Sequence, residues 1–313
     1  MHRCACGKKP IFFQRYDGNY YCEDCLAYSV EKEFNKSLRK LKGRVAVALS
    51  GGADSLSLLY LMKKFFRGDF FALSVDEGIQ GYRNITLEYA KELTKKLEVK
   101  HHIFSFKKEF GMSVDDFPKN IKYCTYCGVL RRYILNKKAR ELGAKKIAVA
   151  HNLDDEAQSI LLNFIKGDFS RFQRLGKEPV LIEDEKFVPR IKPLVNISKK
   201  KLAIYAIIKD IPFLKNKKCP YSKDNMRKDM QIYINALEKK YPGTKLQIVK
   251  FYDKIKSILL EDFKKRKNNI KIKYCNECGE PSSKKICKTC ELIKELKNWP
   301  NQSSKGKSED LPT

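Results

Sequence analysis

Cysteine is the residue of this chain whose number and spacing most clearly point to chemistry. The 313 residues include eleven cysteines, an odd number that cannot form a complete set of disulfides. The N-terminal sequence lacks the apolar core of a signal peptide, so we expect a cytoplasmic protein whose thiols stay reduced. Reduced thiols in such numbers typically bind metals or carry sulfur. They form three groups: Cys4, Cys6, Cys22 and Cys25; Cys124, Cys127 and Cys219; and Cys275, Cys278, Cys287 and Cys290.

The last group has the spacing of a structural zinc site. Two residues separate Cys275 from Cys278, and two separate Cys287 from Cys290. Such pairs are thiolate knuckles, and two of them complete a tetrahedral site. The surrounding segment is too short to build a core, so bound zinc has to supply its folding free energy. The sequence therefore predicts a Zn²⁺ module near the C-terminus.

The first group is less regular. Cys22 and Cys25 form a knuckle, but a single residue separates Cys4 from Cys6. We predict a second Zn²⁺ site made by these four cysteines. His2 is an alternative fourth ligand in place of Cys4, because it lies four residues before Cys6.

The middle group has three cysteines, one fewer than a closed zinc tetrahedron or a fully ligated iron–sulfur cluster requires. Two residues lie between Cys124 and Cys127, a spacing that suits metal clusters and redox pairs alike. Cys219 has to be brought to them by the fold. Ordinary buried cysteines explain this pattern poorly, because a glycine and a basic segment follow Cys127 directly.

A glycine loop, SGGADS at residues 50–55, is the second chemical feature. Its glycines allow positive φ and close backbone approach, so several N–H groups can point at one anion. A helix that starts there adds its own unpaired amides. Ser50 and Ser55 offer hydroxyl donors, and Asp54 offers a loop-fixing or metal-binding carboxylate. The loop reads as a phosphate cradle, although it matches neither GxxxxGK[ST] nor GxGxxG.

Alternating strands and helices have to position these residues. Short apolar runs predict strands, and leucines at three- and four-residue spacing predict helices. The expected strands cover 44–49, 69–76, 101–106 and 145–151, and the helices between and after them cover 55–66, 87–98, 128–143 and 154–167. This order predicts an α/β fold, a doubly wound parallel sheet with helices on both faces. After Pro193 we expect helices at 199–211, with Ser198 as N-cap, and at 231–241 and 248–265.

The charge of the chain indicates a polyanionic partner. Lys and Arg number 65 against 37 Asp and Glu, a formal net charge of +28. Nucleic acid relieves such self-repulsion, and its affinity should then fall steeply with salt as counterions are released. A lysine-rich surface of the thermophile kind is the alternative. No apolar run approaches the roughly 18–20 residues that cross a bilayer, so we expect no membrane association.

The positions of the cysteines divide the chain. We expect an N-terminal zinc module at 1–35, a catalytic domain with a helical C-terminal part at 36–265, and a C-terminal zinc module at 266–297. Residues 298–313 are polar and aperiodic, which is typical of a disordered tail.

With its SGGADS loop the chain resembles the PP-loop ATP pyrophosphatases, which hold ATP there while they adenylate a substrate oxygen. HNLDDEA at 151–157 matches a second segment of the members that modify tRNA. CTYCG at 124–128 and the lone cysteine of KKCPYS match the thiolating members. With zinc modules at both ends, the chain is similar to the TtuA-type 2-thiouridine synthetases, which include the archaeal and eukaryotic wobble-uridine thiolases.

The resemblance implies a set of nucleotide contacts at Ser50, Gly51, Gly52, Asp54, Ser55, Val75, Arg131 and Asp155. Val75 would lie near the adenine, and Asp155 matches a carboxylate of the nucleotide site. Two positions depart from the family. Ala53 replaces a lysine that is common in the loop, so one charge contact with phosphate is missing. Arg131 stands where the family has a lysine, which keeps the charge but changes its geometry.

The resemblance also implies the chemistry: ATP with Mg²⁺ adenylates the C2 oxygen of a tRNA uridine, and sulfur replaces it to give 2-thiouridine. Catalysis would rest on Asp54 and on Cys124, Cys127 and Cys219, which would hold a [4Fe–4S] cluster with one open iron. A persulfide and disulfide pair of Cys127 and Cys219 is the competing mechanism.

Other choices stay open at this point. Free sulfide or a ubiquitin-like carrier could donate the sulfur, the uridine could be the wobble or a T-loop one, and the family suggests a homodimer. The alternative functions are another PP-loop modification of tRNA, such as cytidine 2-thiolation, and a non-catalytic zinc-module RNA-binding protein.

Overall fold

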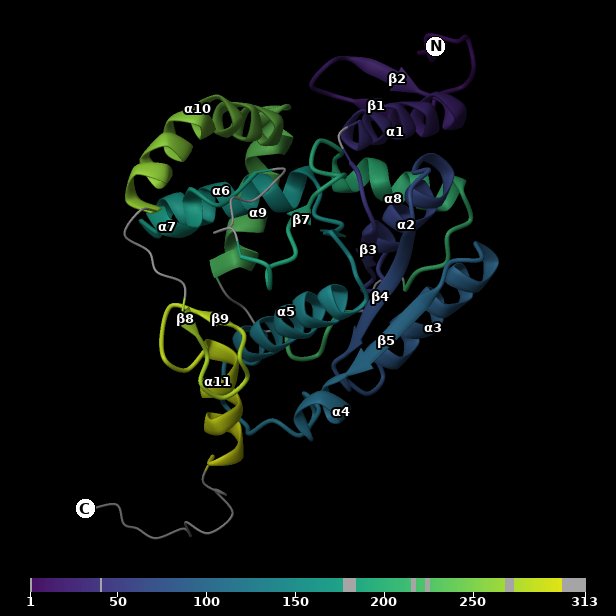
Figure 1. Ribbon diagram of the computed structural model, residues 1–313. Coiled ribbons are helices and arrows are strands. Elements are labelled where there is room, and N and C mark those ends of the chain that lie inside the picture. The colour runs from purple at the N-terminus through teal and green to yellow at the C-terminus, as the bar shows by residue number, and fades with distance from the viewer. Residues whose placement is uncertain are drawn as a thin grey trace, which may run out of the picture.

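The computed structural model describes residues 2–39, 41–176, 184–214, 218–222, 226–267 and 273–299 (Figure 1). The tail expected at 298–313 lies outside these ranges from residue 300 onwards. Within them, a five-stranded parallel sheet of order β5-β4-β3-β6-β7 forms the centre. Its strands are β3 (Val45–Ala48), β4 (Phe70–Asp76), β5 (His101–Ser105), β6 (Lys146–Ala148) and β7 (Arg190–Ile191). The strand order reverses between β3 and β6, so the predicted doubly wound sheet is confirmed, and its switch point lies beside the glycine loop.

The described helices are α1 (Glu23–Leu38), α2 (Ala53–Phe65), α3 (Arg83–Lys96), α4 (Phe106–Phe110), α5 (Tyr123–Glu141), α6 (Leu153–Ile165), α7 (Phe169–Phe172), α8 (Lys199–Ile208), α9 (Met226–Lys240), α10 (Thr244–Lys267) and α11 (Lys288–Lys297). Ser198 caps α8 by accepting a hydrogen bond from the Lys201 amide at 3.4 Å, as expected. α5 begins five residues before its expected start at 128. Cys124 and Cys127 therefore lie in its first turns.

The sheet separates two apolar clusters. Successive residues of β3 point to opposite faces. Val45 and Val47 join the cluster under α2 and α3, whereas Ala46 joins the cluster under α5. Strands buried on both faces need apolar residues throughout, which is why these runs could be recognised in the sequence.

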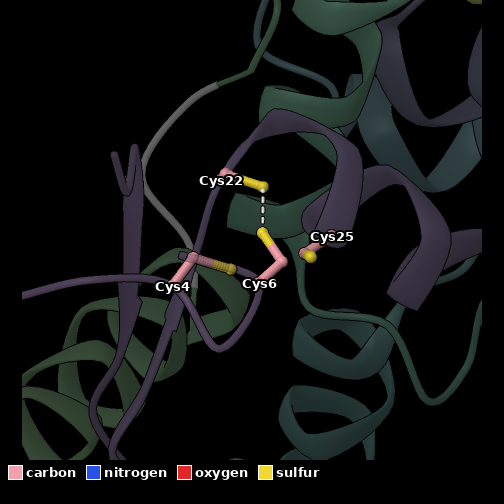
Figure 2. A group of neighbouring side chains, drawn as sticks. All are labelled: Cys4, Cys6, Cys22 and Cys25. Atoms are coloured by element: carbon pink, nitrogen blue, oxygen red, sulfur yellow. Dashed lines mark hydrogen bonds between the residues drawn. The ribbon is translucent and has the colours of Figure 1, made fainter. Parts of the chain in front are cut away.

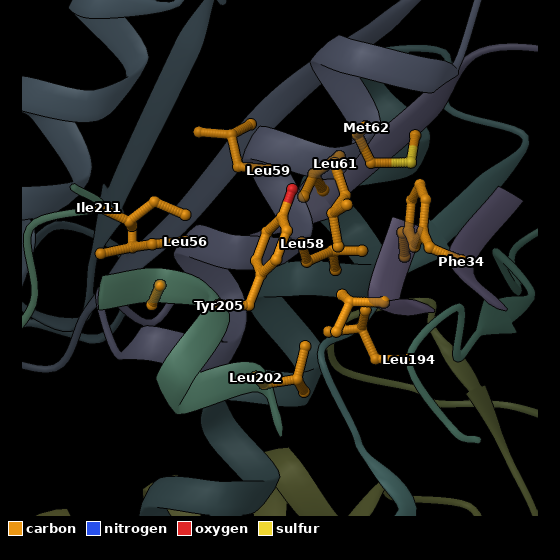
Figure 3. Close-up of a cluster of buried hydrophobic side chains, with 14 of the residues drawn as sticks. Phe34, Leu56, Leu58, Leu59, Leu61, Met62, Leu194, Leu202, Tyr205 and Ile211 are labelled. Atoms are coloured by element: carbon orange, nitrogen blue, oxygen red, sulfur yellow. The ribbon is translucent and has the colours of Figure 1, made fainter. Parts of the chain in front are cut away.

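The larger cluster ties the N-terminal region to the sheet. Leucines of α2 pack in one cluster with Phe34 of α1 and Tyr205 of α8, all of them fully buried (Figure 3). Burial of such side chains contributes about 1.5–3 kcal/mol each. Cys22 is the N-cap of α1 and Cys25 lies in its first turn, so the N-terminal cysteines are anchored to the core through this helix.

Further elements complete the molecule. α6, α9 and α10 pack together beside the sheet, around Leu153 and Tyr252. Two small hairpins carry the terminal cysteines: β1 (Phe12–Gln14) pairs with β2 (Asn19–Tyr21), and β8 (Lys273–Tyr274) pairs with β9 (Pro281–Ser282). These hairpins lie at opposite ends of the molecule (Figure 1). None of the described helices combines the length and apolarity that a membrane span requires.

Candidate active site

The glycine loop connects β3 to α2 at the carboxyl edge of the sheet. Gly51 has φ +78°, and a Cβ atom there would lie 1.9 Å from the Thr86 carbonyl oxygen. Glycine is therefore required at this position. Arg83 fixes the loop from below, since its buried guanidinium donates to the carbonyls of Ser50 and Val75.

The Ser55 hydroxyl organises the inside of the loop. It accepts from the amides of Ser50 at 3.2 Å and Gly51 at 3.1 Å, and it donates to the Gly52 carbonyl at 3.0 Å. Ser55 is buried, whereas Ser50 is exposed. The Ser55 hydroxyl thus fixes the shape of the loop, and the exposed Ser50 lies at its outer side.

Two carboxylates lie next to the loop. Asn152 caps α6 in a capping box with Asp155, and its side-chain amide donates to Asp54 at 3.1 Å. Burial raises the pKa of Asp54 to about 6 despite the nearby charge of Lys199, and the Asp155 carboxylate adds to the rise. Burial also raises the pKa of Asp155. A cation between these carboxylates would favour their ionised forms, as expected of a Mg²⁺–nucleotide site.

The structure brings Cys219 to the two cysteines of α5. Tyr221 stacks on Tyr123 with 4.4 Å between ring centroids, and its hydroxyl donates to Asp115 at 2.8 Å. The Cys124 thiol donates to the Tyr221 carbonyl at 3.8 Å. These contacts fasten the Cys219 loop to the start of α5.

Burial is the main reason why the pKa of Cys127 rises to about 12, and the charges of Glu77, Cys219 and Cys124 add to it while Arg131 opposes it. The three thiols therefore lie close enough to act on one another. Within the described ranges, however, sets of metal-binding atoms no more than 4.8 Å apart occur among the terminal cysteines and do not include these three. Zn–S bonds of about 2.3 Å place tetrahedral thiolates roughly 3.8 Å apart. A donor set with wider spacing suits an iron–sulfur cluster better than a single zinc ion.

Glu77 connects the loop to the cysteines. It lies just after β4, is 4% exposed, and pairs with Arg83 at 2.7 Å and with Arg131 at 3.1 Å. Sequence reasoning missed Glu77 and Arg83, which no motif marks, and it assigned no role to Asn152 although this residue lies in the HNLDDEA segment. Val75 ends up buried in the cluster beside α5, with its carbonyl held by Arg83.

The N-terminal cysteines form a compact set (Figure 2). The sulfur atoms of Cys4, Cys6, Cys22 and Cys25 all lie within 4.8 Å of one another, and those of Cys6 and Cys22 are 3.5 Å apart. His2 stacks on a tyrosine ring instead, with 4.5 Å between centroids. Four thiols at tetrahedral spacing fit Zn²⁺.

The C-terminal cysteines form an equivalent set, with 3.8 Å between Cys275 and Cys290 and 3.6 Å between Cys278 and Cys287. Four thiols at this spacing again fit Zn²⁺.

This C-terminal module docks on α5. Arg140 forms a two-point ion pair with Glu280, and Tyr126 donates to Glu295 at 2.8 Å. Leu296 of α11 belongs to the apolar cluster that also contacts Cys127 and Cys219. The module thus forms one wall of the three-cysteine site.

We expect loss of the C-terminal zinc to uncover that site. Cys278→Ser should reduce bound zinc from two ions per chain to one and unfold the module, because structural zinc contributes about 10–16 kcal/mol at such sites. The Cys127 thiol of the iron-free protein should then react faster with a maleimide, measured by peptide mass spectrometry. Cys25→Ser is the matched control, since it removes the N-terminal zinc and leaves α11 in place. Equal Cys127 labelling in both variants would contradict the role of the wall.

Known proteins resemble the chain along nearly its whole length. The PP-loop domain family matches residues 26–234. The tRNA 2-thiolation protein NcsA of Haloferax volcanii is 32% identical over 93% of this chain and 98% of its own. The tRNA-5-methyluridine(54) 2-sulfurtransferase of Pyrococcus horikoshii is 32% identical over 92% of each chain. The structure of the U34-tRNA thiolase NcsA from Methanococcus maripaludis with its [4Fe-4S] cluster superimposes with a TM-score of 0.78 at 31% identity, over 95% and 97% of the two chains. The likeness thus reaches beyond the PP-loop domain into the terminal cysteine modules.

Proposed function

The chain belongs to the PP-loop family of tRNA thiolases, and from that premise we propose that it uses ATP to convert a uridine of tRNA into 2-thiouridine. One observation carries the proposal most directly. Glu77 pairs with Arg83, which holds the glycine loop, and with Arg131, which lies one turn of α5 after Cys127. An ATP-binding loop and a sulfur-handling site are thereby joined at one edge of the sheet, where open α/β folds bind ligands.

In the first step the C2 oxygen of the uridine attacks the α-phosphate of ATP, and pyrophosphate leaves. The loop amides and the N-terminus of α2 hold the phosphates, while Asp54 and Asp155 would hold Mg²⁺, which shields the charge of the phosphates. Adenylation turns a poor leaving oxygen into a good one. The two carboxylates beside the loop are assigned to Mg²⁺ rather than to proton transfer, so positioning and charge neutralisation carry this step.

In the second step sulfide attacks C2, and AMP leaves with the former C2 oxygen. Cys124, Cys127 and Cys219 would hold a [4Fe–4S] cluster, which would supply a binding position for hydrosulfide beside the adenylated uridine. Arg131 places a positive charge beside the site, which favours anionic sulfur.

We further propose Zn²⁺ at both four-cysteine sets, the four-part division of the chain at residues 35, 265 and 297, and a homodimer acting in the cytoplasm. Free sulfide or a ubiquitin-like thiocarboxylate carrier supplies the sulfur. The two solved or curated thiolases with a named position act on U34 and on uridine 54, so the assay has to locate the modified base.

The decisive experiment incubates the protein anaerobically with tRNA, ATP and sulfide, and analyses the digested nucleosides by mass spectrometry. We expect 2-thiouridine that requires ATP, with one pyrophosphate released per base. Two other results would contradict the proposal. Thiolated cytidine would indicate the related PP-loop modification, and tRNA binding without pyrophosphate release would indicate a non-catalytic RNA-binding protein.

A further inference from the structure

The segment that leads into β7 runs alongside α5. The side chain of Asn136 donates to the Lys186 carbonyl at 2.7 Å and accepts from the Val188 amide at 3.0 Å. One turn further along α5, Arg140 donates to the same Lys186 carbonyl at 2.7 Å. Lys186 thus meets the turns of Asn136 and Arg140, and Val188 meets that of Asn136, so the segment runs antiparallel to α5.

Extended by one more turn of α5, the same course brings Arg190 level with Arg132. Four residues of helix rise about 6 Å, and two residues of strand rise about 6.6 Å, so the step from Val188 to Arg190 parallels the step from Asn136 to Arg132. The sheet register agrees. Arg190 pairs with Ile147, which belongs to the cluster under α5, whereas Ile191 and its own partner belong to the opposite cluster. The Arg190 side chain thus points toward α5 at the level of Arg132.

Neither arginine has a carboxylate partner among the described residues, unlike Arg83, Arg131 and Arg140. Burial and the charges of Arg132 and Arg131 lower the pKa of Arg190 to about 10. Arg132 is exposed, so solvent and ligands can reach the pair.

The charged groups that act on Arg132 have the same sign. Arg131, Arg171 and Arg227 are among them, and the Cys127 thiol opposes their effect. Two guanidinium groups on neighbouring elements repel each other where no carboxylate lies between them. An anion between them would relieve that repulsion and accept several charge-assisted hydrogen bonds.

We propose that Arg132 and Arg190 together grip one backbone phosphate of the RNA strand that carries the target uridine. The inference rests on the proposed function, which supplies RNA as the substrate. Arg132 lies on the turn after Cys127, and its guanidinium nitrogen is 3.3 Å from the point where a side chain of Gly128 would begin. A uridine that reaches the three-cysteine site has to bring its flanking phosphates past this turn.

The phosphates of ATP are the less suitable ligand. The glycine loop follows β3, and β7 is two strands away from β3, a distance of about 9.6 Å. The arginine pair also lies on the α5 face of the sheet, whereas the helix that starts at the loop, α2, covers the other face. The pair therefore forms a site of its own beside the reaction centre.

The test measures tRNA affinity as a function of salt for Arg132→Gln, Arg190→Gln and the double variant. Each contact with one phosphate contributes about 0.9 to the slope of log K against log[salt]. Because both side chains share one phosphate, the double variant should lose about 0.9 in total rather than twice that. Its affinity at fixed salt should fall about tenfold or more, and the KM for tRNA should rise while the KM for ATP stays constant.

Two controls accompany these variants. Lys91→Gln removes the same charge from an exposed pair with Glu88 on α3 and should leave affinity and slope unchanged. Arg132→Lys keeps the charge but loses the two-point fork, so it should keep the slope while binding more weakly. If Gln variants fail to fold, this conservative variant still tests the idea.

The outcomes separate the alternatives. A raised KM for ATP with an unchanged salt slope would indicate that Arg132 and Arg190 bind the nucleotide rather than RNA. That result would overturn the inference. An unchanged slope and unchanged KM values would show that the pair is merely solvated. Absence of any thiolation by the wild-type protein would instead count against the proposed function, and the RNA-binding measurements would remain valid on their own.

Discussion

Serine in place of Cys124, Cys127 or Cys219 should abolish both the iron–sulfur cluster and tRNA thiolation. Protein purified and reconstituted without oxygen should be brown and contain about four irons per chain. Each single substitution should bleach it, because two thiolates and one hydroxyl hold a cluster poorly. Iron content, visible absorbance and 2-thiouridine yield measure the effect. Folding should persist, since Cys124 is exposed and the other two are only partly buried.

Cys25→Ser is the matched control for iron. It should lower the zinc content while the iron content and the colour stay as in the wild type. The persulfide mechanism predicts instead that thiolation does not require iron, because it uses only Cys127 and Cys219. Thiolation at the wild-type rate by iron-free protein would therefore exclude the cluster mechanism.

Asp54→Asn should reduce pyrophosphate release by on the order of 100- to 1000-fold, the usual effect of removing one preorganised electrostatic contact. The substitution is isosteric, and its side-chain oxygen can still accept from Asn152, so the loop should keep its shape. Ser55→Ala should lose activity as well, because the amides of Ser50 and Gly51 lose their shared acceptor. Leaving such groups unpaired costs about 1–3 kcal/mol.

Ser57→Ala is the control for this pair. Ser57 lies two residues further along α2, is fully buried, and its hydroxyl has no hydrogen-bond partner among the described residues. Its removal should leave activity unchanged and stability unchanged or slightly higher. Circular dichroism and tRNA affinity establish that each variant is folded. Normal activity in both Asp54→Asn and Ser55→Ala would remove the loop from the mechanism.

The sequence predicted the sheet well because buried parallel strands have few compatible residues. Runs such as 45–48 and 70–76 are almost wholly apolar, and the loop between β3 and α2 has a spacing that few other functions need. β7 could not be predicted. It has two residues, one of them an arginine, and pairs along a single edge. No periodicity exists in an element of that length.

The candidate site was predictable where residues share a motif and not where the fold brings single residues together. Glu77 acquires its role because Arg83 and Arg131 reach it from two different helices. The expected start of α5 was too late because two metal-binding cysteines at CxxC spacing were assumed to lie in a loop before the helix. Tyr123 stacks on Tyr221, which is remote in the sequence, and sequence periodicity does not encode such a contact.

The packing of α11 against α5 also has a consequence for the order in which metals bind to the chain. Leu296 packs in the apolar cluster that Cys127 and Cys219 contact, and the four C-terminal cysteines gather at the start of α11. A chain that received iron before zinc would present its iron ligands with one side open to oxygen. With zinc at this set and iron at the central cysteines, as proposed, zinc has to bind first, and zinc shortage should appear as oxidative loss of iron before the sheet unfolds.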